Sequence, residues 1–383
     1  MAIPKIALIP SGVKAGKLYS VLPTDGAGDF TTTRASVATR VNENGLIEEV
    51  ASNVPRLDYS DGACPSLLLE DTATNLVLTS DSGNYGSAPA SETLTISPDG
   101  TNNAVIPTPN TDFDRYQQDI SGGTYATNTL LTYSWYRKRI STPVITSFVG
   151  DLKSVSNVNL TISEATTQIE SDINGFDRFQ VVVQITDGAL ASTFRAYFGD
   201  IVGVGNSSVA YFGHQYEVGS YATSLINTIG ISLTRVADTA TDSGNSTVIN
   251  SSEGTLYFEA SVTQSGTVQL YGNASARIWV ELNDLDTKLY INNGAGAVVL
   301  ASSTIASGFN SYRKIAISYK ENIFKIFVNG TGLTVTPTQD TFVDSTLNEV
   351  TFSFGSPLYG KAKSLQVYTT ALSDAELTTL TTI

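Results

Sequence analysis

Two tryptophans occur in strand-like runs where an aromatic ring could stack on the apolar face of a sugar. In the run 130–139, Tyr133, Trp135 and Arg137 alternate along the chain, so in a strand they would share one face of the sheet. Such a row could stack on a sugar ring and donate hydrogen bonds to its hydroxyls. A tryptophan in a mid-domain strand is more often buried, so we expect Trp135 to lie between two sheets in preference to binding a ligand.

The second tryptophan is the better candidate for a surface contact. Arg277, Trp279 and Glu281 would share one face of a strand, whereas the aliphatic residues that alternate with them would share the other. The aliphatic set is the obvious core face. Trp279 would therefore lie on the opposite, exposed face, where it could contact a sugar or another subunit.

Few residues could support catalysis or bind zinc. His214 is the only histidine and Cys64 the only cysteine, which excludes a multi-His or Cys-based zinc site and an intrachain disulfide. His214 lies in the strand-like run 211–216 with no nucleophile elbow beside it, so we expect a structural or solvent-facing histidine. Cys64 is expected to be a buried, inert thiol.

Carboxylates could act as catalytic acids and bases or as calcium ligands. The chain has 36 Asp and Glu residues, mostly in turns, and no acidic row typical of a sandwich glycanase stands out. The segment Asn283–Asp286 could supply oxygen ligands to calcium, but between two strands it is more typical of a polar turn. Its spacing also differs from a helix–loop–helix calcium loop. We predict no catalytic residue, no metal and no cofactor, and calcium remains a minor alternative.

Composition and charge narrow the class of protein. Thr, Ser, Gly and Asn are abundant, which favours sheets and turns over helices. The net charge of −14 argues against nucleic acid as a partner, since phosphate binding needs clustered Lys and Arg. No apolar run approaches the roughly 20 residues of a membrane helix, so no membrane insertion is expected. Pro4 and Pro10 interrupt the first apolar stretch, which is too short for a secretory signal, so we expect folding in a cytoplasm.

The strand and turn signals predict an all-β chain. An N-terminal extended arm and short β adaptor (1–80) would precede two β-sandwich or jelly-roll domains (81–240 and 241–383). The dipeptides at 44–45 and 329–330 are both Asn-Gly, the strongest short hairpin signal. Near the end, Ser373 and Glu376 form a capping-box pattern, and Leu377 and Leu380 would pin the short helix to a sheet.

The last segment resembles a known fold family. In the run 314–330, Ile315, Ile317 and Tyr319 alternate as in a half-buried strand, and the run closes with the Asn-Gly turn. Near its end the chain carries the sequence ALSDAEL at 371–377. These features resemble the laminin-G/concanavalin-A-like lectin sandwich. The resemblance implies recognition of a surface and not covalent chemistry.

Three blocks near the start resemble a leader of virion proteins from tailed bacteriophages. They are TRASVATRVNENGLIE at 33–48, PRLDY at 55–59 and LLLEDTATNL at 67–76. The resemblance implies a tail, tail-fibre or head-fibre component whose N-terminal arm contacts other virion proteins. Further along, the block 211–226 and TRVAD at 234–238 resemble the closing strand of carbohydrate-binding jelly rolls in the same phage proteins. Here Phe212 replaces the usual Trp and His214 a small residue.

These observations predict a non-enzymatic structural protein of a tailed bacteriophage, a fibre or decoration protein located in the virion. It would be a homo-oligomer, with a trimer favoured, and would display lectin-like sandwiches for adhesion to glycans of the host surface, such as a bacterial surface polysaccharide. The candidate carbohydrate-binding residues are Trp279, Arg277, Trp135, Tyr133 and Arg137. Two alternatives remain: a polysaccharide depolymerase on a sandwich scaffold, and a capsid or tail cement that binds no ligand.

Overall fold

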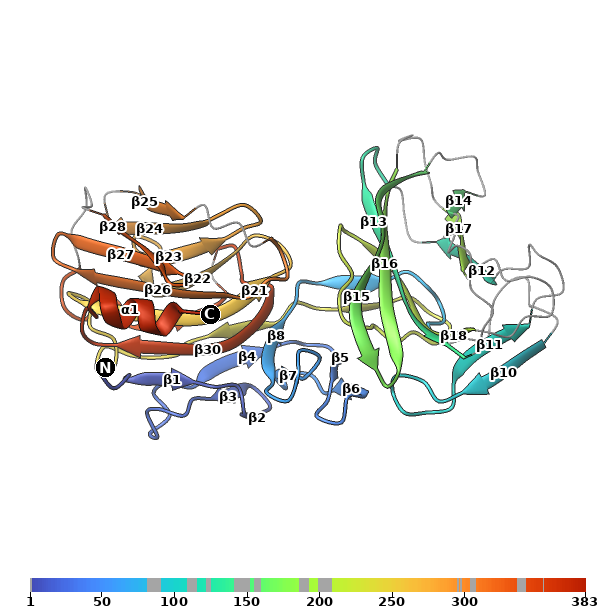
Figure 1. Cartoon of the computed structure of the whole chain (residues 1–383), viewed down its shortest axis with the longest axis horizontal. Helices are drawn as coiled ribbons and strands as arrows, with labels where there is room; N and C mark the ends of the chain where they lie inside the picture. The colour runs from blue at the N-terminus through green and yellow to red at the C-terminus, as the bar shows by residue number, and fades with distance from the viewer. Residues whose placement is uncertain are drawn as a thin grey trace. The chain divides into compact units, whose positions relative to one another are not determined.

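The computed structural model describes residues 2–383 except 81–90, 109–115, 122–124, 141–151, 155–159, 186–192, 199–208, 295, 297, 304–307, 336–341 and 354. Thirty strands and one helix form the regular structure of the described residues, so the predicted all-β class is confirmed (Figure 1). The contacts divide the chain into two compact units. Unit 1 comprises residues 1–36, 50–71 and 237–383, and unit 2 comprises 37–49 and 72–236.

Unit 1 is a sandwich of two antiparallel sheets that share one core. The eight-stranded sheet has the order β28-β27-β26-β21-β30-β8-β7, with β1 also paired to β30. Its strands are β1 (Ile6–Leu8), β7 (Arg56–Asp58), β8 (Ser66–Leu69), β21 (Gly254–Val262), β26 (Arg313–Lys320), β27 (Ile323–Val328), β28 (Thr331–Val335) and β30 (Gly360–Tyr368). Phe258 and Ile315 of this sheet meet Leu270 and Val280 of the opposite sheet in a single buried cluster.

The opposite sheet is five-stranded, with the order β25-β24-β23-β22-β29. Its strands are β22 (Gly266–Asn273), β23 (Ala276–Leu282), β24 (Thr287–Asn293), β25 (Val298–Ser303) and β29 (Glu349–Thr351). A smaller sheet of order β2-β3-β4-β20 completes unit 1. It consists of β2 (Gly12–Lys14), β3 (Lys17–Tyr19), β4 (Phe30–Thr33) and β20 (Thr239–Thr241).

Two local predictions for unit 1 are confirmed. Asn329 and Gly330, with φ of 50° and 82°, form the two-residue turn that joins β27 to β28. The helix α1 (Asp374–Thr381) begins with the predicted capping box between Ser373 and Glu376. Its Leu377 is fully buried in a cluster on the outer face of the eight-stranded sheet, beside which α1 lies in Figure 1.

The N-terminal segment does not form the extended arm that the sequence suggests. Strand β1 pairs antiparallel with β30, with Ile6 opposite Val367, and its apolar residues Ile6 and Leu8 are buried in the core of the sandwich. Strand β8 pairs with the other half of the same edge of β30. Pro4 and Pro10 flank β1 without interrupting it, so a strand of only three residues fits between them.

Unit 2 is built on a six-stranded antiparallel sheet of order β10-β11-β18-β13-β16-β15. Its strands are β10 (Ser91–Thr95), β11 (Ala104–Thr108), β13 (Leu130–Arg139), β15 (Leu160–Ile173), β16 (Phe176–Ile185) and β18 (Val209–Val218). Both faces of the sheet are buried, because Trp135 and Tyr136 of β13 belong to different core clusters. The predicted Asn44-Gly45 turn lies in a hairpin that contributes Val41 and Ile47 to the second cluster.

The remaining sheets of unit 2 are small. A three-stranded sheet has the order β12-β17-β14, and two pairs, β9 with β19 and β5 with β6, stand apart from it. Their strands are β5 (Ala38–Val41), β6 (Ile47–Val50), β9 (Ala73–Asn75), β12 (Tyr116–Ser121), β14 (Leu152–Ser154), β17 (Thr193–Phe198) and β19 (Leu233–Arg235).

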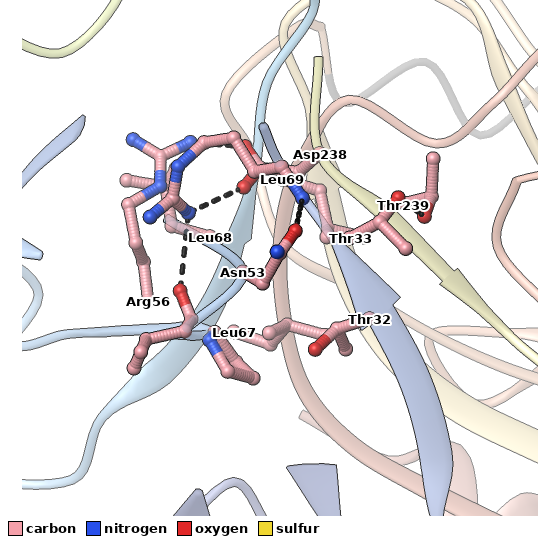
Figure 2. A pocket seen from close by; sticks show the side chains of 12 residues that line it. Thr32, Thr33, Asn53, Arg56, Leu67, Leu68, Leu69, Asp238 and Thr239 are labelled. Carbon is pink, nitrogen blue, oxygen red and sulfur yellow. Dashed lines mark hydrogen bonds and ion pairs between the residues drawn. The ribbon is translucent and has the colours of Figure 1, made fainter. Parts of the chain in front are cut away.

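A buried ion network joins distant segments of unit 1. Arg34 Nη1 donates to Asp238 Oδ1 at 2.9 Å, and Arg56 pairs with both Asp238 and Glu70. The two arginine side chains are at most 1% exposed. Figure 2 shows Arg56 and Asp238 among the side chains that line a hollow beside this network. The hollow holds only about 10 Å³, roughly the space of one water molecule, so it has no room for a larger ligand.

The network lies next to every point where the chain passes from one unit to the other. The passages fall at 36–37, 49–50, 71–72 and 236–237. Arg34 donates to the carbonyls of Ser36, Val50 and Ala51, and Glu70 and Asp238 lie within two residues of the last two passages. One set of buried charges therefore fixes the ends of all four connections within unit 1.

We predict that Asp238→Asn destabilises unit 1 by about 3–5 kcal/mol, because it leaves two buried guanidinium groups without a full counter-charge. Chemical denaturation of the variant measures the loss. The matched control is Asp344→Asn, an exposed carboxylate of the same unit, which should change the free energy of unfolding by less than about 0.5 kcal/mol. Equal effects of the two substitutions would contradict the role given to the network.

Candidate functional site

The first predicted row of binding residues lies in the core of unit 2. Trp135 is 0% exposed and Tyr133 is 2% exposed, and their rings stack with centroids 4.8 Å apart. The guanidinium of Arg137 lies over the ring of Phe179. Phe179 belongs to the neighbouring strand β16, where it packs against Trp135. Trp135 is thus buried between layers, as its place in a mid-domain strand suggests. A sugar could not reach Trp135 or Tyr133 without opening this core.

The second predicted row lies on the outer face of the five-stranded sheet of unit 1. Ile278, Val280 and Leu282 of β23 point into the sandwich core and are fully buried, so Arg277, Trp279 and Glu281 point outward, as their alternation predicts. The register places Trp279 opposite Tyr290 of β24 and Gln269 of β22. We call the outward residues of these three strands around Trp279 the Trp279 surface: Tyr271, Arg277, Trp279, Glu281, Lys288, Tyr290 and Asn292. Gln269 also points outward but is only 1% exposed.

Trp279 is less exposed than its position suggests. Its ring stacks on Tyr290 with centroids 4.9 Å apart and planes 4° from parallel, and the guanidinium of Arg277 lies 4.4 Å from the ring centroid. These contacts leave the indole 8% exposed, so the expectation of an exposed Trp279 is wrong. Tyr290 and Arg277, whose side chains support and cover the indole, are half-buried and therefore partly exposed to solvent.

The residue that sequence reasoning missed on this face is Tyr290. The signal for it was the alternation in 287–293, where Leu289 and Ile291 are fully buried and Lys288, Tyr290 and Asn292 take the other face. Burial and the nearby Glu281 carboxylate raise the pKa of the Tyr290 phenol. The hydroxyl therefore stays protonated at neutral pH and can donate a hydrogen bond.

The Trp279 surface combines the groups that a sugar needs. Tyr290 supplies aromatic surface for the C–H face of a ring and is held in place by the buried Trp279, and Arg277 and Lys288 supply charged donors. Glu281 supplies an acceptor at the same register as Lys288. The arrangement suits binding by stacking and hydrogen bonding on an open sheet face.

The turn that could have held calcium is stabilised by an arginine. Arg313 donates to the carbonyl oxygens of Asn283, Asp286 and Gly308 at 2.5–3.2 Å, so a cation of the chain already sits among them. The Asp286 carboxylate pairs with Lys288. No group of three or more potential metal-ligating side chains occurs among the residues that the structure describes.

Two groups that could act in catalysis, His214 and Lys361, are held in unreactive states. His214 is buried in unit 2, where its Nδ1 lies 2.6 Å from the Tyr133 hydroxyl, and burial lowers its pKa to about 3. In unit 1, Lys361 donates to Ser60 Oγ at 2.5 Å. Despite its burial, the carboxylates of Asp58 and Asp61 raise the pKa of Lys361, so it stays protonated and cannot act as a base toward Ser60.

Cys64 departs from its expected environment. It lies in the turn between β7 and β8 and is exposed, so the prediction of a buried thiol is wrong. The turn residues 61–64 are all exposed, because the chain leaves the sheet at Tyr59 and returns only at Ser66.

In the parts of the chain that the structure describes, no helix is long and apolar enough to cross a membrane.

Comparison with known proteins gives only distant likenesses. No family model and no curated protein matches the chain. The sialidase CBM40 of Ruminococcus gnavus, solved with α2,3-sialyllactose, is similar over 34% of this chain and 83% of its own, at 19% identity and a TM-score of 0.30. The mouse laminin α1 domains LG4-5 are similar over 77% of this chain and 96% of their own, at 10% identity and a TM-score of 0.26. At these values no property of either protein is transferred to this chain.

Buried neutral His214 should make the stability of unit 2 depend on pH. Its folded pKa of about 3 lies below the ordinary 6.5, so the unfolded chain binds a proton first as the pH falls. Stability is then fully present above pH 6.5 and is lost between pH 6.5 and 3. We predict that wild type loses about 2 kcal/mol more than His214→Gln between pH 7 and pH 5, measured by chemical denaturation. Parallel pH profiles for the two proteins would refute this assignment.

Proposed function

We propose that the chain is a non-enzymatic adhesion protein that binds glycans through the Trp279 surface. The observation that carries this proposal is the stack of the half-buried Tyr290 on Trp279, flanked by Arg277, on the outer face of the five-stranded sheet. A sheet face with an accessible ring, donors and an acceptor binds an extended polymer chain without enclosing it. Single contacts of this kind are weak, and several copies in one assembly would make them useful.

The assembly that we propose is the particle of a tailed bacteriophage. The support is the resemblance of the blocks at 33–48, 55–59 and 67–76 to the leader of phage virion proteins. In this proposal the chain is a fibre or decoration protein of the virion, forms a homo-oligomer and contacts other virion proteins. Because β1 and β8 belong to the unit 1 sandwich, the contact would use the folded surface of unit 1 in place of a free arm.

The sequence favours binding over hydrolysis. A sandwich glycanase needs a pair of accessible carboxylates, and no acidic row of that kind stands out in the chain. An incubation of the protein with polysaccharide, set up to measure binding, also tests for hydrolysis. Release of new reducing ends from a bacterial surface polysaccharide would favour a depolymerase instead.

A glycan array or titration with bacterial surface polysaccharide tests the binding site. We expect Tyr290→Ala to weaken binding by about tenfold, or about 1.4 kcal/mol, because it removes a stacking ring and a donor. Arg277→Ala should act in the same direction. The control is Lys320→Ala, which removes an exposed cation from the opposite sheet of the same unit and should leave binding unchanged. Equal binding by all variants would exclude the Trp279 surface.

Location is tested independently of binding. We expect antibodies against unit 1, detected by immunogold electron microscopy, to label purified phage particles at regular positions on the head or tail. Unlabelled particles, with the protein found only in the soluble fraction of infected cells, would refute the virion assignment and leave the binding test standing.

A further inference from the structure

Unit 2 contains a hollow of about 210 Å³ that no part of the proposed adhesion site explains. It lies beside the β5–β6 hairpin, between this hairpin, the turn after β10 and the segment that follows β18. Its volume is below the roughly 300–1,000 Å³ of pockets for drug-sized ligands, which suits a ligand of a single ring.

The floor of the hollow is apolar. Ile47, Phe212 and Leu225 line it, and all three belong to one buried cluster of unit 2. The sequence pattern places Phe212 where related jelly rolls are expected to have Trp, so an aromatic ring is retained at this position. An apolar floor of this kind packs against C–H groups and excludes water beneath them.

The rim offers acceptors on one side. Glu49 is exposed at the hollow, and no hydrogen bond or ion pair joins its carboxylate to another described residue. Asp99 accepts from the backbone and hydroxyl of Thr101, at 2.8 Å each, and from the Ser97 hydroxyl, in every case through Oδ1. Within the described chain, Oδ2 of Asp99 takes part in no such bond. The third rim carboxylate, Glu48, is paired with Arg40 at 2.6 Å.

The rim also offers a donor whose orientation is fixed. Asn227 Oδ1 accepts from the Ser80 hydroxyl at 2.5 Å, which leaves the amide nitrogen as the donating end of the side chain. Among the residues that the structure describes, this nitrogen has no acceptor. Neutral hydroxyls, which donate to carboxylates and accept from amides, match both sides of the rim.

We propose that this hollow is a second binding site, specific for one uncharged, polyhydroxylated ring such as a neutral sugar residue. Its carboxylates repel anionic sugars, and its apolar floor disfavours a cation whose charge would be buried against it. The site lies in unit 2 and is independent of the Trp279 surface of unit 1. One chain would then hold two glycan contacts on separate units.

Saturation-transfer NMR with methyl glycosides of neutral hexoses and N-acetylhexosamines, with glucuronate and with arginine methyl ester tests the proposal on the full chain. We expect at least one neutral glycoside to bind, glucuronate to fail, and Glu49→Gln and Asn227→Ala to weaken binding by about tenfold. The matched control is Glu43→Gln, an exposed glutamate in the turn of the same hairpin, which should bind as wild type does.

The outcomes separate this site from the adhesion site. Binding that survives Tyr290→Ala and fails in Glu49→Gln supports the hollow. Binding that survives Glu49→Gln and Asn227→Ala, a preference for arginine methyl ester, or no binding of any glycoside overturns this inference. Each of these results leaves the proposal for the Trp279 surface to its own test with polysaccharide.

Discussion

The structure of unit 1 depends on a small set of buried charges. Arg34 and Arg56 are enclosed with Asp238 and Glu70, so each guanidinium has a carboxylate within hydrogen-bond distance, and Arg34 has further carbonyl acceptors. Such a group is costly to bury alone and is tolerated only when its partners are in place. The pairing therefore selects one arrangement of segments that lie some 200 positions apart in sequence.

The Trp279 surface follows from the same sandwich by alternation. Burial of Ile278 and Val280 in the core requires their neighbours on β23 to face outward, and the antiparallel register then brings Tyr290 beside Trp279. The two rings and Arg277 pack on one another, which fixes their positions before any ligand arrives. A preorganised face of this kind loses little conformational entropy on binding.

Local patterns in the sequence predicted much of this fold, and long-range contacts explain what they missed. Alternation gave the strands around 314–328 and 276–282, and the capping box at Ser373 depends only on residues three apart. The pairing of β1 with β30 joins residues about 360 positions apart. Strand β1 has only three residues, which is too short to show a periodicity from which the pairing could be predicted. The burial of Trp279 was missed for the same reason, since Tyr290, which stacks on it, comes from a neighbouring strand, and Cys64 is exposed together with the rest of the turn residues 61–64.

The pairing of β1 with β30 has a mechanical consequence. The strands are antiparallel, with Ile6 opposite Val367 and Leu8 opposite Leu365, so the chain enters the first and leaves the second at the same end of the pair. Tension applied at these two points would peel the strands apart one hydrogen-bonded pair at a time, a mode that yields at lower force than sliding all pairs together. Unit 2 is inserted between segments of unit 1 and lies outside that path of force. Stretching would thus open the edge of the unit 1 sandwich while unit 2 kept its fold.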